Sequence, residues 1–245
     1  MNKFRNVHGL SGVVAVSCSG EGNKRVGGLA MFWKEGVEVE VLSLSSNHID
    51  VLIAIENGDE KWRLTGVYGF PKSQMKHKTC ELIDQLSLVE STDKWFLMGE
   101  FNLILSQDEK EGGNFGSSHM ISMFRDTLQN HNLSYLGFEG DKFTWHNRQD
   151  GVSNIKARLD RMVATPAWSS FYPSASVVHL TRYASDHLPL WLRLASRKLI
   201  SVKKELNRLY VLGTLITWFA SYPAKSSQIL KNHSIMLFTS NVNSL

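Results

Sequence analysis

Short runs of apolar residues, several with polar residues at every second position, cover most of residues 1–195. Such runs are typical of β-strands that bury one or both faces. Val37–Leu44 shows the alternation most clearly, and the hairpin dipeptide Asn57-Gly58 marks a turn before the run that ends at Tyr68. Strands are predicted at residues 13–16, 29–33, 37–44, 49–56, 63–68, 95–99, 143–145, 157–164, 176–180 and 190–194.

Two segments have helical spacing instead. In Met75–Val89 the apolar residues Cys80, Ile83 and Leu86 recur at the spacing of one helix face, and Met120–Asn130 repeats the pattern. Many strands with few helices between them predict an α/β (α+β) fold, in which a mixed-sheet sandwich is flanked by helices.

After Leu194 the alternation stops, and Ser, Asn and Lys separate apolar clusters. Leu209–Tyr222 is the most apolar stretch, but it is shorter than the ~20 residues of a membrane-spanning helix. It is interpreted as a poorly packed segment or an amphipathic docking helix. We therefore expect one domain over residues 1–196, an unrelated basic and apolar extension over residues 197–245, and no stable membrane span.

Composition narrows the class of protein. With 245 residues, 42% of them hydrophobic, the chain is long enough for a globular core, which excludes a disordered tail, a fibre and a disulfide mini-protein. Cys18 and Cys80 have no metal-ligand spacing and fit a reducing compartment. Because no apolar segment with a cleavage site opens the chain, secretion is not expected, and nuclear and cytoplasmic locations both stay open.

The net charge of +4 is unevenly distributed. Residues 197–245 contain seven Lys and Arg against one acid, Glu205, so they carry +6 and residues 1–196 carry −2. A general phosphate-attracting surface is therefore not expected on residues 1–196. Any affinity of this part for nucleic acid has to come from a local patch or a bound metal ion.

Three short constellations could carry chemistry: the first lies at the end of a predicted strand, the second within one and the third before one. They are Gly99-Glu100-Phe101-Asn102, Arg158-Leu159-Asp160 and Ser185-Asp186-His187. A carboxylate near an amide can bind a divalent metal and orient water, and an Asp–His pair can move a proton or hold a phosphoryl oxygen. Each constellation also has a plainer explanation. Glu100 and Asn102 could simply form a turn, and Asp186 could cap one. Asp160 could form a surface salt bridge with Arg158 or Arg161.

Seven stretches together carry a family resemblance: GGLAMFWKEGVEVEVLSLSSNHIDVLI, LTGVYGFP, KWFLMGEFNLIL, EKEGG, FTWHNRQ, IKARLDRMVATPAW and SDHLPLWLRL, within residues 10–195. The chain resembles the endonuclease/exonuclease/phosphatase superfamily, whose fold is shared by DNase I and apurinic/apyrimidinic endonucleases. It is most similar to the endonuclease domain of plant LINE-type (non-LTR) retrotransposons. The resemblance implies a four-layer α/β/β/α sandwich and a Mg²⁺- or Mn²⁺-dependent phosphodiesterase that acts on DNA without a small-molecule cofactor.

The motif match also implies roles for single residues. Tyr68 of GVYGFP would contact the scissile phosphate, and Asn102 of GEFN would orient the attacking water or bind phosphate. Asp160 of RLD would hold the tautomer of His187, which assists phosphate binding or proton transfer. Asp186 of SDH would lie at or near the metal.

Two departures from the family pattern lower the expected activity. Glu100, expected as a catalytic residue and metal ligand, replaces the Asp of G-D-x-N. Its extra methylene moves the carboxylate by about 1 Å or more, and a displacement of that size can cost about a hundredfold in rate. The matching text also begins after the family's first two strands, which carry an Asn and a metal-binding Glu. We therefore expect a truncated domain with an open sheet edge and weak or no endonuclease activity.

Several alternatives stay open. The chain could be a non-catalytic remnant that binds nucleic acid weakly through residues 197–245, or a phosphatase of the same fold. Trp145 either lines a substrate groove or belongs to the core, and Lys110 is a groove contact or a solvated loop residue. The remaining histidines, among them His48 and His179, lack metal-like spacing and are expected on the surface or in loops. DNA sequence preference and oligomeric state are left undetermined.

Overall fold

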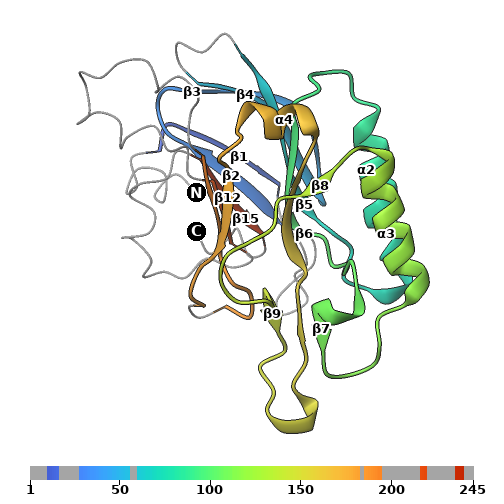
Figure 1. Ribbon diagram of the computed structural model, residues 1–245. Helices are drawn as coiled ribbons and strands as arrows, with labels where there is room; N and C mark the ends of the chain where they lie inside the picture. The colour runs from blue at the N-terminus through green and yellow to red at the C-terminus, as the bar shows by residue number, and fades with distance from the viewer. Residues whose placement is uncertain are drawn as a thin grey trace.

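The computed structural model describes residues 10–16, 28–55, 60–182, 185–194, 216–219 and 235–239. These residues form two large sheets, a small sheet and a layer of helices (Figure 1). Sheet I has the strand order β1 (Gly12–Val16), β2 (Leu29–Trp33), β15 (Ile235–Thr239), β14 (Ile216–Phe219), β13 (Leu190–Arg193) and β12 (Ser176–His179). Sheet II has the order β3 (Val37–Ser45), β4 (His48–Ile55), β5 (Trp62–Tyr68), β6 (Trp95–Glu100), β11 (Asp160–Ala164) and β8 (Ser134–Tyr135).

Sheet II follows the hydrophobic pattern of the sequence closely. Strand β3 lies at its edge, and its two acids, Glu38 and Glu40, are exposed, whereas Val37 and Val39 are half-buried. The inner strand β6 has all six residues buried, as expected for a continuous apolar run that is covered on both faces. Strand β5 runs parallel to β6 and antiparallel to β4, whereas β11 pairs antiparallel with β6.

The two large sheets pack face to face around one hydrophobic core. Side chains of β2 and β13 from sheet I share this core with side chains of β4, β5 and β6 from sheet II. The short helix α4 (Pro166–Phe171) adds Trp168, whose ring stacks on Phe96 with centroids 4.6 Å apart. This helix was not predicted from the sequence, because six residues are too few to show helical periodicity.

Helices α2 (His77–Ser87) and α3 (Ser118–Asn130) cover the outer face of sheet II (Figure 1). The predicted apolar positions Cys80, Ile83 and Leu86 of α2 are buried. Cys80 is a free thiol, and Cys18 lies outside the described residues. At the start of α3, the Ser117 hydroxyl caps the helix by accepting a hydrogen bond from the Met120 N–H.

Sheet I contains two strands from the predicted C-terminal extension. Strand β15 pairs antiparallel with β2 and parallel with β14, which in turn pairs antiparallel with β13. Residues 216–219 are thus a strand where the sequence suggested a helix or a loosely packed segment, because Ile-Thr-Trp-Phe is a β-branched and aromatic run. Strands β15 and β14 lie between β2 and β13, and β1 and β12 form the two edges of the sheet. The division of the chain at residue 196 stays a prediction, since most of residues 197–245 lie outside the described part.

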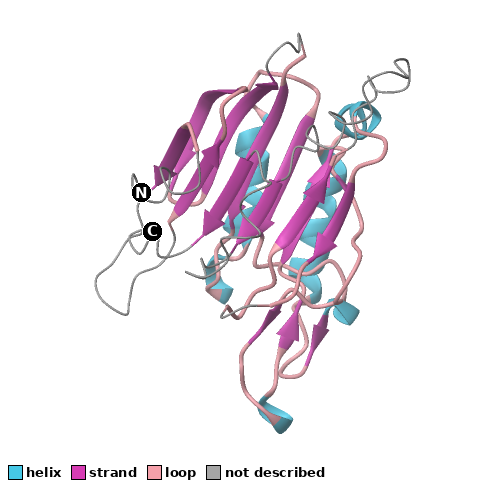
Figure 2. Ribbon diagram, turned by 90° about the vertical axis from the view of Figure 1, so that its left-hand side faces the viewer, coloured by secondary structure: helices cyan, strands magenta, loops and turns pink. Residues whose placement is uncertain are grey.

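The described residues provide three of the four expected layers. Figure 2 looks onto sheet I and shows the helices behind the strands, so the near face of sheet I is not covered by any described helix. A small sheet of β7 (Lys110–Glu111), β10 (Lys156–Ala157) and β9 (Trp145–His146) projects from the end of the sandwich (Figure 1). Short 3₁₀ turns lie at η2 (Ser73–Met75), η3 (Gln107–Glu109) and η4 (Gly151–Ser153).

Candidate active site

Three candidate residues lie in one row across sheet II. Tyr68, the last residue of β5, is the parallel partner of Glu100, the last residue of β6. Asp160, the first residue of β11, is the antiparallel partner of Glu100 on the other side. The pairing of the three strands therefore brings together residues that are far apart in the sequence.

Asn102 joins this row because two backbone segments approach each other closely. A Cβ atom on Gly69 would come within 2.2 Å of the Phe101 carbonyl oxygen, so only glycine permits the contact. The buried Asn102 has a φ of 57°, a left-handed conformation that Asn tolerates better than most residues. Its Nδ2 donates to the Gly69 carbonyl oxygen at 2.9 Å, which fixes the amide beside Tyr68.

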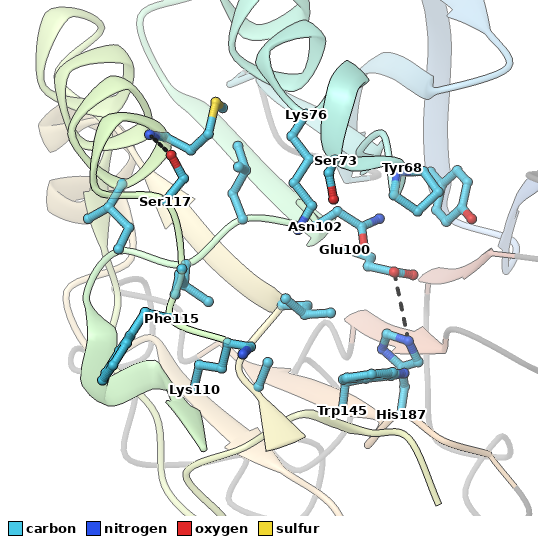
Figure 3. Close-up of a pocket in the computed structure, with 18 of the residues that line it drawn as sticks. Tyr68, Ser73, Lys76, Glu100, Asn102, Lys110, Phe115, Ser117, Trp145 and His187 are labelled. Carbon is cyan, nitrogen blue, oxygen red and sulfur yellow. Dashed lines mark hydrogen bonds and ion pairs between the residues drawn. The ribbon is translucent and has the colours of Figure 1, made fainter. Parts of the chain in front are cut away.

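His187 reaches the row from the loop before β13, on the sheet I side. Its Nδ1 lies 2.7 Å from Asp160 Oδ2. Its Nε2 lies 3.8 Å from Glu100 Oε1, the contact marked by a dashed line in Figure 3. Burial disfavours the imidazolium, but the charges of Asp160 and Glu100 outweigh burial and raise the pKa of His187 to about 9. The Asp–His pair predicted from the sequence is thus brought together.

The pKa values of two neighbours are also shifted. Burial, with contributions from Asp160 and Asp186, raises the pKa of Glu100 to about 7, although His187 acts in the opposite direction. Burial, followed by the carboxylates of Glu100 and Asp186, raises the pKa of Tyr68 to about 12. The Tyr68 hydroxyl therefore keeps its proton at neutral pH and is available as a hydrogen-bond donor.

Thr144 belongs to the surroundings of the site but was not predicted from the sequence. It is fully buried, and its Oγ1 accepts hydrogen bonds from the backbone N–H groups of Leu159 and Asp160, each at 3.0 Å. Its carbonyl oxygen accepts from the Leu188 N–H at 2.7 Å. Thr144 thus ties the strand of Asp160 to the loop of His187. Its place in FTWHNRQ, next to Trp145, was the available signal.

Asp186 and Trp145 lie together at the same site. Trp145 Nε1 donates to Asp186 Oδ2 at 3.1 Å, and both residues line a cavity of 610 Å³ that also contains Tyr68, Glu100 and His187 (Figure 3). This places Trp145 at the cavity rather than in the core. The cavity falls within the range of about 300–1,000 Å³ that is usual for ligand sites. Lys110, the other open case, lines it as well.

Two expectations from the sequence are wrong: the surface salt bridge of Asp160, and the surface position of two histidines. Asp160 is fully buried rather than part of a surface salt bridge, and Arg158 and Arg161 both bind the buried carboxylate of Glu109. His48 and His179 are buried rather than at the surface. Hydroxyl groups of two serines hydrogen-bond the ring of His48, and the ring of His179 stacks on Phe138.

The donor set of the site could hold a divalent cation. Glu100, Asp160 and His187 each offer an atom within 4.8 Å of the others. Oxygen ligands suit Mg²⁺, and a cation would favour the ionised form of Glu100, whose pKa is raised by burial and, to a smaller extent, by Asp160 and Asp186. Since Asp160 and His187 already bind each other, Glu100 is the carboxylate of the trio best placed to serve as a ligand.

Comparison with known proteins supports the architecture. No family model and no curated protein matches the chain. Among solved structures, the endonuclease domain of TRAS1, a telomere-specific non-LTR retrotransposon, matches with a TM-score of 0.59 at 16% identity, over 76% of this chain and 81% of its own. This chain has the DNase I-like fold.

Two further solved structures match the chain with lower TM-scores. A beta toxin variant from Staphylococcus aureus with bound magnesium ions has a TM-score of 0.46 at 15% identity, over 71% of this chain and 70% of its own. The D. rerio TDP2 complex with a single-strand DNA product has a TM-score of 0.43 at 13% identity, over 76% of each chain.

None of the helices in the described residues is long and apolar enough to cross a membrane.

Proposed function

We propose that the chain is a divalent-metal-dependent phosphodiesterase of the retrotransposon endonuclease type that cleaves DNA. The observation that carries this proposal is the buried Glu100–Asp160–His187 cluster in the wall of a 610 Å³ cavity. Hydrolysis of a phosphodiester needs an activated water and neutralisation of the charge that develops on phosphorus. The cluster combines carboxylates with an oriented imidazole, which suits both tasks.

In the proposed reaction, Asp160, His187, Tyr68 and Asn102 have different roles that follow from their positions. Asp160 holds Nδ1 of His187, so that Nε2 faces the cavity, where it transfers a proton or binds a phosphoryl oxygen. The Tyr68 hydroxyl donates to the scissile phosphate, since its raised pKa keeps it protonated. The side chain of Asn102 orients the attacking water or binds the phosphate.

Glu100 and Asp186 would hold Mg²⁺ or Mn²⁺. Both line the cavity, and each lies close enough to the site to influence the pKa of His187. When bound, such a cation lowers the pKa of a coordinated water and stabilises negative charge on the phosphoryl oxygens. We propose that cleavage is weak, because the Glu100 carboxylate is one methylene further from β6 than the Asp of the family pattern.

Nicking of supercoiled plasmid in the presence of Mg²⁺ tests this function. His187→Ala and Asp160→Asn should each lower the nicking rate by about 10²–10⁴-fold. Val152→Ala, which changes a fully exposed side chain on η4, serves as the control and should have no effect. Nicking that persists in both site variants would contradict the proposal.

Two variants and two substrates separate the competing functions. Glu100→Asp should raise the nicking rate by up to about a hundredfold if the extra methylene is the defect. Asp186→Ala should remove the Mg²⁺ binding measured by calorimetry. Release of inorganic phosphate from a soluble monoester without nicking would favour a phosphatase. DNA binding without cleavage that is lost on neutralising the basic residues of 197–245 would favour a non-catalytic remnant.

A further inference from the structure

The loop over residues 112–116, termed the Phe115 loop, presents an exposed aromatic side chain at the cavity. Phe115 is 91% exposed, and it is the aromatic member of the few large hydrophobic side chains that are strongly exposed in the described residues. It nevertheless lines the same cavity as Glu100 and His187. Figure 3 shows it at the opposite end of that cavity from these two residues, with Lys110 in between.

Hydrogen bonds fix the backbone of this loop on both sides of Phe115. Lys110 Nζ donates to the carbonyl oxygen of Gly112 at 2.8 Å and also to that of Asn114. The amide of Gln107 clamps Gly116, donating to its carbonyl oxygen at 2.7 Å and accepting from its N–H at 3.0 Å. An exposed Phe on a loop that is already ordered loses little conformational freedom when it binds a partner.

Glycine at the start of the loop keeps it against the neighbouring hairpin. Gly112 and Gly113 have φ values of 77° and 61°, which favour glycine. A Cβ atom on Gly112 would come within 2.0 Å of the Asn154 carbonyl oxygen. The two glycines of EKEGGNF thus allow the loop to hold Phe115 in a fixed position.

The surroundings of Phe115 suit a polyanion with flat bases. Lys76 and Lys110 line the cavity between Phe115 and the catalytic row (Figure 3). Within the described part of the chain, Lys76 Nζ forms no ion pair, so its charge is available to a phosphate group. Proteins that bind single strands commonly combine cations that follow the phosphates with aromatic rings on which bases stack.

We propose that Phe115 stacks on a nucleobase of the DNA strand that lies in the cavity, at the opposite end of the cavity from the phosphate held at His187. This inference rests on the proposed function and adds to it a position where the enzyme contacts a base. The backbone of the strand would pass Lys76 and Lys110, and an unstacked base would cover the exposed face of the Phe115 ring. Phe115 is a substrate-binding residue and takes no part in the proton transfers.

Binding of a labelled single-stranded oligonucleotide to the full chain, measured by fluorescence anisotropy without divalent metal, tests the stacking. Phe115→Ala should weaken binding by about 5- to 100-fold, the effect expected from loss of one stacked base. Phe115→Trp should preserve the affinity, and Phe115→Leu should not, because leucine is apolar but offers no aromatic face. Val152→Ala is the matched exposed control and should bind like the parent.

An abasic scan of the oligonucleotide identifies the base. At one position, removal of the base should weaken binding of the parent chain and leave binding of Phe115→Ala unchanged. A parent chain that binds and nicks DNA while Phe115→Ala or Phe115→Leu behaves identically would overturn the stacking and leave the proposed function intact. A parent chain that binds no DNA at all would overturn both.

Discussion

The two large sheets of this fold are assembled in opposite ways. Sheet II comes from one stretch of the chain, residues 37–164, whereas sheet I combines residues 12–33, 176–193 and 216–239. Tyr68, Glu100 and Asp160 lie on sheet II, while Asp186 and His187 enter from the loop before β13 of sheet I. The site therefore forms only when both sheets are in place, and its stability depends on contacts between distant parts of the sequence.

Removal of residues 197–245 should have the largest effect on this arrangement. It takes away β14 and β15 and separates β2 from β13, which exposes two inner strand edges. A typical domain is stable by only about 5–15 kcal/mol. Because loss of two central strands removes a large part of the packing of sheet I, we expect the shortened chain to lose its cooperative unfolding transition. Denaturant titration followed by tryptophan fluorescence measures this loss.

A point substitution separates the role of the strands from the mere shortening of the chain. Leu237→Pro removes a backbone donor from β15, a strand paired on both sides, and should lower the free energy of unfolding by at least about 1–3 kcal/mol, the cost of an unsatisfied buried partner. If both variants unfold at the same denaturant concentration as the parent, these strands do not form the centre of sheet I.

The same difference explains what the sequence could and could not predict. All strands of sheet II except the two-residue β8 were found from local periodicity, and the candidate residues Tyr68, Glu100 and Asp160 from short motifs. The position of β14 in the sheet was not, because its partner β13 is more than 20 residues away and four residues of Ile-Thr-Trp-Phe show no distinguishing period. The contact of Thr144 with Asp160 was likewise hidden, since a threonine in a short aromatic motif gives no sign of which backbone groups it will bind.

Glu109 provides a second, smaller test, confined to the sheet II side. Its buried carboxylate binds Arg158 and Arg161, and Arg161 is fully buried on β11 next to Asp160. Glu109→Gln leaves these guanidinium groups without their counter-charge and should lower the free energy of unfolding by about 3–5 kcal/mol. A change below about 1 kcal/mol in denaturant unfolding would show that this ion cluster does not stabilise the strand of Asp160.

The pH dependence of stability should change in the same variant. Burial alone would raise the pKa of Glu109, but Arg161 and its hydrogen bonds hold it below the ordinary value. Because the folded pKa is depressed, the stabilisation is complete above about pH 4.3, the usual pKa of unfolded Glu, and is lost as the pH falls through the folded value. The parent should therefore lose more stability than Glu109→Gln on acidification from pH 5 to 3.

Thr144 offers the smallest and most selective perturbation, because it links the strand of Asp160 to the loop of His187 through hydrogen bonds without itself lining the cavity. Thr144→Val keeps the shape of the side chain but removes the acceptor of the Leu159 and Asp160 N–H groups. Leaving buried donors unsatisfied should cost about 1–3 kcal/mol of stability. A displaced Asp160 would also misplace His187, so the rate of plasmid nicking should fall by about tenfold or more under conditions where the variant is fully folded.

Thr144→Ser retains the hydroxyl and should restore nicking even if part of the lost stability is not recovered. If valine and serine reduce stability but neither changes the nicking rate, Thr144 supports the fold alone, and the alignment of the Asp160–His187 pair must depend on other contacts.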